Sequence, residues 1–274
     1  MRLKSTRVAS LLASAAVAAA LALPVAGCKT TGDDITGSVA AAGAPRSDAD
    51  WRQQVEVWSG RYREKPSDPD TAIAYARALR ATDQRAQAVA VLEQASIRNP
   101  HNMPLLGAYG RALAAAGDYN QALDVLGRAH TPDQPDWRIL NAQGAVLDQL
   151  GRHSEAQRHY SAALKIKPGE PSILSNLGLS YALSKDLRRA EATLQQAMGR
   201  PNAGPKVRQN LALVVGLEGR FAEAEKIASA DLPGDEAAAN VRYLREMLAR
   251  RGQESKKISK KTARASVPPP DADN

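Results

Sequence analysis

Small and large apolar residues recur along this chain at a fixed spacing of 34 residues. Five blocks of that length align without gaps, and we number the positions within a block as places. Small residues close together on two neighbouring helices let the helix backbones approach each other. The blocks begin at Pro69, Met103, Trp137, Pro171 and Pro205. Small residues fill place eight (Ala76, Gly110, Gly144, Gly178, Ala212), place twenty (Ala88, Ala122, Ala156, Ala190, Ala224) and place twenty-seven (Ala95, Ala129, Ala163, Ala197).

Larger apolar residues and turn signals complete the pattern. Leucine, tyrosine or valine holds place eleven, and glycine or lysine with a polar neighbour then marks a turn, as in Gly117-Asp118 and Lys185-Asp186. The pattern resembles the tetratricopeptide repeat, a helix-turn-helix unit. It predicts an all-α fold, a right-handed α-solenoid of five helical hairpins over residues 69–238 with capping helices at both ends. The departures from the pattern are Ala72, Arg208, Ala228 and Asp231, which fall in the first and last units, where atypical residues are expected.

Two further helices are predicted beside the repeats. Trp51, Val55, Trp58 and Tyr62 recur on one helical face, so residues 48–68 should form an N-terminal helix that docks on the first repeat. Ser47 or Asp48 is the expected cap. Apolar residues at helical spacing predict a closing helix over residues 239–251. The tail at 252–274 is basic, contains three consecutive prolines and buries little, which predicts disorder.

The N-terminal residues predict export and lipid attachment. Arg2, Lys4 and Arg7 precede an uncharged apolar run, Val8 to Leu23, as in a secretory signal. Residues 25–28 then resemble a bacterial lipobox, and Cys28 is the only cysteine of the chain. We therefore expect a signal peptide over 1–27, lipid on Cys28 and a flexible leash over 28–47. An ordinary signal peptide or an uncleaved anchor is the alternative.

The residue after Cys28 bears on the membrane that would hold the lipid. Lys29 stands where an aspartate would act as an inner-membrane retention signal in enteric-type bacteria. Assuming a host with two membranes, the expected location is the outer membrane, on its periplasmic face and lipid-anchored.

Charge changes this picture little. The net charge is +8, and much of the excess lies in the C-terminal tail. An exported protein rarely meets nucleic acid, so no nucleic-acid partner is expected. The tail either contacts anionic headgroups or acidic cell-wall polymer, or only keeps the protein soluble.

No catalytic or metal-binding arrangement emerges from the sequence. His153 and His159 lie on different sides of a predicted helix, and His101 and His130 lie near turns without carboxylates spaced to join them. Phosphate loops and nucleophile motifs are also lacking in the sequence. The expectation is a non-enzyme without cofactor or metal.

A binding surface is predicted on the first helix of each repeat. In this fold, places two, five, nine and twelve line the concave face, and here they are rich in cations and amides. An acidic or C-terminal segment of a protein partner is the predicted ligand, because guanidinium groups pair with carboxylates and amides hold an extended backbone. The alternative is that these side chains only solvate the helices. The candidates, with two asparagines from place six, are Arg77, Arg80, Arg111, Arg138, Asn141, Asn176, Lys206 and Asn210.

Longer stretches narrow the resemblance. Trp58–Tyr62, Ala78–Leu92 and the ending from Asp231 through Asn240–Leu248 are similar to the TadD family of repeat lipoproteins, which belongs to the tight-adherence (Flp) pilus assembly system. The resemblance implies a factor that helps the outer-membrane secretin of that machine to assemble. An adaptor for cell-wall synthetic enzymes, or an enzyme whose site escapes detection, is the alternative. Partner identity and oligomeric state stay open.

Overall fold

The computed structural model describes residues 47–265, which hold twelve helices, α2 to α13, and no strand. Cys28, the predicted signal peptide and nearly all of the predicted leash lie outside these residues. The chain divides into two compact units, residues 1–202 and 203–274. None of the described helices is both long enough and apolar enough to cross a membrane. The predicted all-α fold is confirmed.

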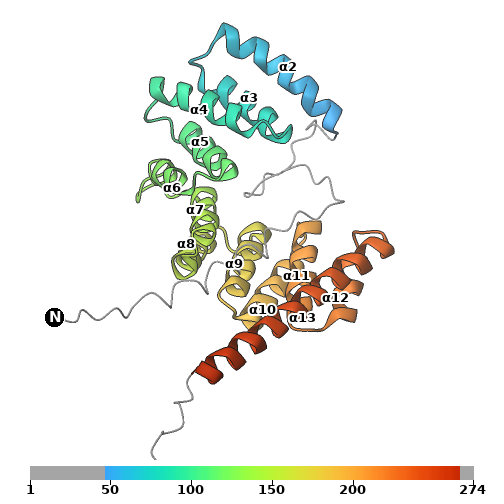
Figure 1. Cartoon of the computed structure of the whole chain (residues 1–274). Coiled ribbons are helices and arrows are strands. Elements are labelled where there is room, and N and C mark those ends of the chain that lie inside the picture. Colours follow the sequence, from blue (N-terminus) through green and yellow to red (C-terminus); the bar gives the residue numbers. More distant parts are fainter. Residues whose placement is uncertain (1–46, 266–274) are drawn as a thin grey trace, which may run out of the picture. The chain divides into compact units, whose positions relative to one another are not determined.

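Unit 1 is a run of antiparallel helical hairpins that follow one another along the chain (Figure 1). Each predicted block start is also the first residue of a helix, so the repeat spacing located the hairpins correctly. Within each hairpin the two helices pack together, and the second helices of the first three hairpins each pack on the first helix of the next hairpin. The hairpins are α3 (Pro69–Ala81) with α4 (Arg85–Arg98), α5 (Met103–Ala116) with α6 (Tyr119–Gly127), α7 (Trp137–Gln149) with α8 (His153–Ile166), and α9 (Pro171–Leu183) with α10 (Leu187–Met198).

The predicted N-terminal helix is α2 (Asp48–Glu64), which precedes the first hairpin. Ser47 caps it, and its hydroxyl accepts from the backbone N–H of Asp50 while the Asp50 carboxylate accepts from the backbone N–H of Ser47. The apolar stripe packs on α3 as predicted, with Trp51 buried and the rings of Tyr62 and Tyr75 5.5 Å apart.

The packing within hairpins explains the small residues at place eight. A Cβ added at Gly110 would lie 2.5 Å from Leu126 Cγ, and one at Gly178 would lie 2.7 Å from Leu194 Cγ. Both distances are far below van der Waals contact. The large residue of the second helix therefore rests directly on the backbone of the first.

Every hairpin turns at the same place. The residue at place fifteen has a left-handed backbone in all five repeats: Gly117, Gly151 and Gly219, but also Asp83 (φ 62°) and Lys185 (φ 67°). The next backbone N–H then donates to the carbonyl of place eleven, for example Asp118 to Leu113 at 3.0 Å. Such a six-to-one bond closes a helix C-terminus. Glycine suits this position because a Cβ is strained there.

Unit 2 holds the fifth hairpin, α11 (Pro205–Leu217) with α12 (Phe221–Ala228), and a long helix, α13 (Gly234–Ala265). A Cβ at Gly216 would lie 2.5 Å from Leu244 Cδ2, so α13 packs closely on α11. Arg208 and Asp231, two of the departures from the repeat pattern, pair with each other through two hydrogen bonds of 2.6 and 2.7 Å. The positive charge at place four and the negative charge at place twenty-seven therefore compensate each other, so the two departures belong together.

The predicted closing helix was too short, and the prediction of disorder from residue 252 is wrong as far as Ala265. The helix begins at Gly234 and continues fourteen residues beyond Arg251. Adding a residue to an existing helix needs no new nucleus, and residues 253–265 are mostly helix-tolerant with no proline. The prediction of disorder rested on how little these residues can bury, and it did not consider that a helix already formed could continue through them. Residues 266–274 lie outside the description.

Candidate functional site

The first helices of unit 1 expose some of the predicted binding places and cover others. Arg77 at place nine and Arg138 at place two are exposed, and Arg80 and Arg111 are half-buried. Places five and twelve are covered in the middle repeats, because α3, α5, α7 and α9 pack against one another in sequence. Places two and nine are therefore the open positions of this surface.

The structure corrects the prediction for Asn141. This side chain is fully buried, and its Oδ1 accepts a hydrogen bond of 3.0 Å from Nδ2 of Asn176 on α9. Asn141 therefore cannot contact a partner directly. It instead fixes the amide of the half-buried Asn176, which the sequence also proposed as a binding residue. The sequence did not show that the next first helix covers place five.

Two predicted residues belong to the other unit. Lys206 is exposed and Asn210 is half-buried on α11. Both residues belong to unit 2, whereas α3, α5, α7 and α9 belong to unit 1. The candidate site of unit 1 consists of Arg77, Arg80, Arg111, Arg138 and Asn176.

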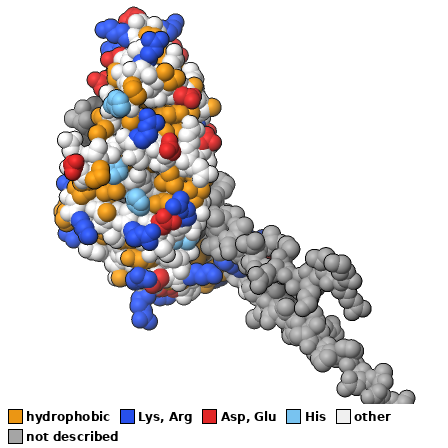
Figure 2. Space-filling model, turned by 90° about the vertical axis from the view of Figure 1, so that its left-hand side faces the viewer, with side chains coloured by type: hydrophobic (Ala, Val, Ile, Leu, Met, Phe, Trp, Pro, Cys, Tyr) orange, Lys and Arg blue, Asp and Glu red, His pale blue; other side chains and the backbone are white. Residues whose placement is uncertain are grey.

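Tryptophan supports two of these arginines, which sequence reasoning did not foresee. The guanidinium carbon of Arg77 lies 5.5 Å from the ring centre of Trp51, and that of Arg138 lies 4.5 Å from the ring centre of Trp137. Both distances fall in the range of cation–π attraction. A tryptophan next to an arginine, as at 137–138, was the available signal. On the face shown in Figure 2, basic side chains lie scattered among apolar and acidic ones, so charge alone marks no site there.

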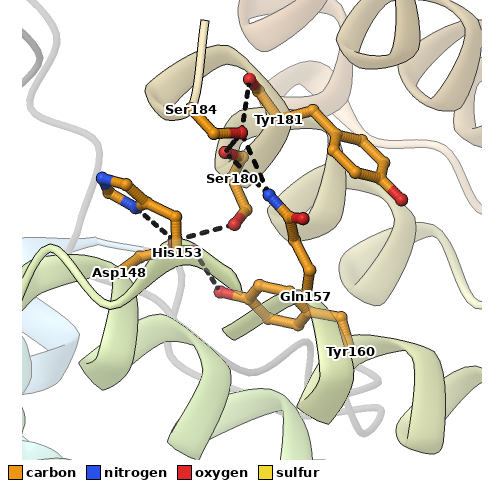
Figure 3. Close-up of polar contacts among 7 residues, drawn as sticks. All are labelled: Asp148, His153, Gln157, Tyr160, Ser180, Tyr181 and Ser184. Atoms are coloured by element: carbon orange, nitrogen blue, oxygen red, sulfur yellow. Dashed lines mark hydrogen bonds and ion pairs between the residues drawn. The ribbon is translucent and has the colours of Figure 1, made fainter. Parts of the chain in front are cut away.

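A second polar arrangement joins the third and fourth repeats (Figure 3). Asp148 on α7 is 9% exposed and accepts three hydrogen bonds, from Nδ1 of His153 (2.9 Å), the hydroxyl of Tyr160 (3.0 Å) and the hydroxyl of Ser180 on α9 (2.8 Å). Nearby, Nε2 of Gln157 on α8 donates to the hydroxyl of Ser184, the C-cap residue of α9, at 3.0 Å, which adds a second link between the third and fourth repeats.

Burial dominates the acid–base behaviour of this network. It raises the pKa of Asp148, and the hydrogen bonds from His153, Ser180 and Tyr160 oppose that change only in part. Burial and the neighbouring carboxylate also raise the pKa of Tyr160 well above its usual value. Both carboxylate oxygens of Asp148 have hydrogen-bond partners, so the network links two repeats and holds them in register.

The remaining histidines do not assemble a metal site. Across residues 47–265, no group of three or more histidine, cysteine or acidic side chains could hold an ion. His130 and His159 each bury an Nδ1 atom without a hydrogen-bond partner. Burial and the nearby charges of His130 and Arg158 lower the pKa of His159, which keeps its ring neutral near pH 7.

Comparison with known protein families identifies the hairpins. Residues 79–144, and separately residues 138–170, match models described as tetratricopeptide repeat. Residues 79–170 of unit 1 thus match the tetratricopeptide repeat, and the helical hairpins are of that type. No curated protein matches the sequence.

Solved structures agree on the fold of the tetratricopeptide repeats. The crystal structure of PilW, described as a widely conserved type IV pilus biogenesis factor, has a TM-score of 0.62 at 16% identity, covering 70% of this chain and 91% of PilW. A chain of the APC/C hetero-tetramer Cut9-Hcn1 has a TM-score of 0.58 at 17% identity, covering 72% of this chain and 40% of that one. A chain of the human IFIT1 dimer with PPP-AAAA has a TM-score of 0.54 at 16% identity, covering 66% and 45%.

These similarities establish the fold and leave the ligand open. This chain spans less than half the length of the Cut9-Hcn1 and IFIT1 chains that it matches. Stacked tetratricopeptide hairpins form extended surfaces of the kind that bind other proteins. The partner must be inferred from the side chains that such a surface exposes.

Proposed function

We propose that this protein is a lipid-anchored tetratricopeptide-repeat scaffold that binds protein partners and supports assembly of a tight-adherence (Flp) pilus machine, through its outer-membrane secretin. The observation that carries the binding function is the row of arginines on successive first helices, with Arg77 on α3, Arg111 on α5 and Arg138 on α7. Carboxylates of a partner segment are suitable ligands for guanidinium groups.

Two further observations support the pilus part of the proposal. The stretches 58–62, 78–92 and 240–248 resemble TadD lipoproteins. The fold is also similar to that of PilW, whose description names a role in pilus biogenesis, although that likeness concerns the fold. A lipid on Cys28 would confine the scaffold to the membrane surface and raise its effective concentration near membrane-bound partners.

Crosslinking in living cells tests the partner. A photo-reactive amino acid in place of Arg111 should capture the pilus secretin or another pilus-assembly component, identified by mass spectrometry. The same amino acid in place of Ala86, which is exposed on α4, a second helix of a hairpin, is the control. Capture of a cell-wall synthase from position 111 would instead support the adaptor alternative and contradict the pilus role.

The anchor is tested separately with Cys28→Ala. Loss of the lipid should lower the mass of the mature protein and move it from the membrane pellet to the soluble fraction. An unchanged mass together with unchanged pelleting would remove the lipoprotein assignment.

A further inference from the structure

The last part of α13 extends beyond the packing that holds this helix to the rest of unit 2. Val241 and Leu244 are buried, and Leu248 is half-buried. From Ala249 onward every side chain that the structure describes is exposed, yet the helix continues to Ala265. The extension over residues 249–265 is about 25 Å long. Its described side chains are therefore available to a further partner.

This extension carries most of the excess charge of the chain. It contains seven basic residues and one acidic residue, Glu254, so its net charge is +6, compared with +8 for the whole protein. Arg250 lies 4.0 Å from Glu246 in the preceding turn, and both are exposed, so this ion pair is weak. One acidic residue cannot neutralise seven basic ones, and the extension therefore keeps a strongly positive potential.

Helical register gathers these basic residues on one side. Successive residues of an α-helix are about 100° apart around its axis. Six of the seven fall within an arc of about 140° that runs about 21 Å along the axis, with Glu254 at its border. The opposite side contains mainly glycine, alanine, serine and threonine. The six residues, which we call the basic stripe, are Arg250, Lys256, Lys257, Lys260, Lys261 and Arg264.

The basic stripe weakens the helix on which it lies. Lys256 and Lys260 are like charges four residues apart, as are Lys257 and Lys261, and such pairs destabilise a helix. Gly252 destabilises it further. A surface of opposite charge would remove the repulsion, so binding to such a surface and helix formation should strengthen each other.

Composition indicates which kind of surface the basic stripe fits. Four of its six residues are lysines, which act as compact point charges and lack the two-pronged donor geometry of arginine. The stripe contains neither an aromatic ring that could stack on a base nor an amide that could hold a peptide backbone. Ile258 is the one large apolar residue in the sequence 249–265, so the helix can rest on headgroups without deep insertion. These features favour a broad, uniformly charged surface.

We propose that residues 249–265 of α13 form a second membrane contact, which lies on an anionic phospholipid surface through the basic stripe. The inference rests on the proposed lipid anchor, which would hold the chain beside such headgroups and raise the effective concentration of the helix there. Each lysine or arginine near an anionic membrane adds to the attraction, and basic clusters of this size on a helix are typical of binding to anionic lipids.

Vesicle binding tests the contact without the lipid. The chain from Lys29 to Asn274 omits the predicted signal peptide and the lipid site but keeps every described residue. It should sediment with vesicles of phosphatidylglycerol and phosphatidylcholine in equal parts, and far less with phosphatidylcholine alone. Raising the salt from about 0.1 M to about 1 M should release it, because the contact is electrostatic.

Three outcomes of this experiment would contradict the proposal. Equal binding to both kinds of vesicle would show that the headgroup charge is irrelevant. Binding that persists in the high salt would indicate an apolar contact instead of an electrostatic one. Tighter binding of soluble polyphosphate than of the anionic vesicles would overturn the membrane as the partner.

Two variants with the same change in charge locate the contact. Changing the four lysines of the basic stripe to glutamine should weaken binding to the anionic vesicles about a hundredfold. Changing four exposed basic residues of unit 1 to glutamine should weaken it by less than about threefold. Equal losses in the two variants would show that only the net charge matters. The unit 1 positions are Arg98, Lys165, Lys167 and Arg188.

A proline distinguishes a helical stripe from a merely charged tail. Ser259→Pro interrupts α13 at a register position opposite the basic stripe and keeps every charge. It should weaken binding to the anionic vesicles severalfold and reduce the gain in helix content that these vesicles produce, as measured by circular dichroism. Ser259→Ala is the control and should bind as the unmodified chain does. Unchanged affinity in the proline variant would overturn the helical stripe.

Failure of this inference can be told apart from failure of the proposed function. If the protein in cells carries the lipid and position 111 captures a pilus component, but the lysine variant binds vesicles normally, the stripe is wrong and the scaffold function stands. If Cys28→Ala leaves the mass unchanged while the vesicle experiments succeed, the anchor is wrong and the stripe stands. Washing the membranes with high salt removes protein held only by the stripe, so pelleting after the wash reports the lipid.

Discussion

Two junctions of unit 1 use the same places for opposite chemistry. Between the second and third repeats, one hydrophobic core contains three buried apolar residues. They come from places twelve and twenty-four of the second repeat and from place ten of the third. Between the third and fourth repeats, the same three places hold a carboxylate and two hydroxyls, and both hydroxyls donate hydrogen bonds to the carboxylate. The two sets are Ala114, Leu126 and Val146, and Asp148, Tyr160 and Ser180.

The comparison shows that the repeat determines how closely the helices pack at a junction, but not whether the side chains there are apolar or polar. In both hairpins the place-eight residue is a glycine under the place-twenty-four side chain, and a Cβ at Gly144 would lie 2.6 Å from Tyr160 Cε1. What differs is tolerance to change. An apolar contact loses only part of its energy when one partner shrinks, whereas a buried polar group loses its hydrogen bond and is left desolvated.

The largest effect is expected from Asp148→Ala. Removing the carboxylate leaves the hydroxyls of Tyr160 and Ser180 buried without a partner, which should lower the free energy of unfolding by about 3 kcal/mol in urea denaturation. Asp124→Ala, at an exposed residue of α6, is the control and should change stability by less than about 0.5 kcal/mol.

The triple variant Asp148→Ala, Tyr160→Leu, Ser180→Val gives the third junction the residues of the second. It should recover most of the lost stability, because all the buried donors disappear together. A triple variant as unstable as Asp148→Ala alone would contradict the view that the two junctions share one geometry.

This contrast also shows how much could be read from the sequence. The spacing of small residues located all five hairpins, because close helix packing requires those residues wherever the backbone repeats. It could not show that Asp148, at place twelve of the predicted binding face, is buried with Tyr160 and Ser180. Partners in space follow from packing between repeats, and tyrosine at a leucine place was the signal available for this network.

Packing between repeats also explains why only some of the predicted binding residues lie at open places. Places two, five, nine and twelve share a helix face, so sequence periodicity treated them alike. The neighbouring first helix then covers places five and twelve, which turned Asn141 from a binding residue into a buried support for Asn176. Of the arginines at the open places, Arg77 and Arg138 are exposed and Arg111 is half-buried. The tryptophan under Arg77 lies on α2, and periodicity alone does not show a contact between two helices.

In unit 2, a polar pair again replaces apolar residues at the same places of the repeat. Arg208 and Asp231 stand where the second to fourth repeats have leucine and alanine, and their side chains are 28% and 11% exposed. Arg208→Ala should lower the free energy of unfolding of this unit, because Asp231 loses both of its hydrogen bonds to the guanidinium group, and the partial exposure of the pair reduces this loss. Arg208→Leu with Asp231→Ala should be more stable than either single change, as measured by a double-mutant cycle. Simple additivity in that cycle would show that the two departures are independent.

A gain in stability is expected at the turn of the fourth repeat. Lys185 adopts a left-handed backbone where three other repeats have glycine. Lys185→Gly should relieve the strain of the Cβ and stabilise the chain by up to about 1 kcal/mol, seen as a higher midpoint of thermal unfolding. Lys167→Gly, at an exposed residue whose φ is −127°, is the control and should not stabilise. Equal shifts in both variants would rule out strain at place fifteen as the cause.

The smallest effect concerns pH and again contrasts a buried polar group with its surroundings. Because the pKa of His159 is lowered in the folded state, mainly by burial, the unfolded chain binds more protons as the pH falls below about 6.5. Stability should therefore decline from pH 7 toward pH 5, and level off below the folded-state pKa. His159→Gln removes the titrating ring and should flatten this decline in urea unfolding measured at several pH values. His101→Gln, at an exposed residue before α5, should leave the decline as it is in the unmodified protein. A decline that persists in the His159 variant would place the acid-sensitive group elsewhere, with the network around Asp148 as the next to test.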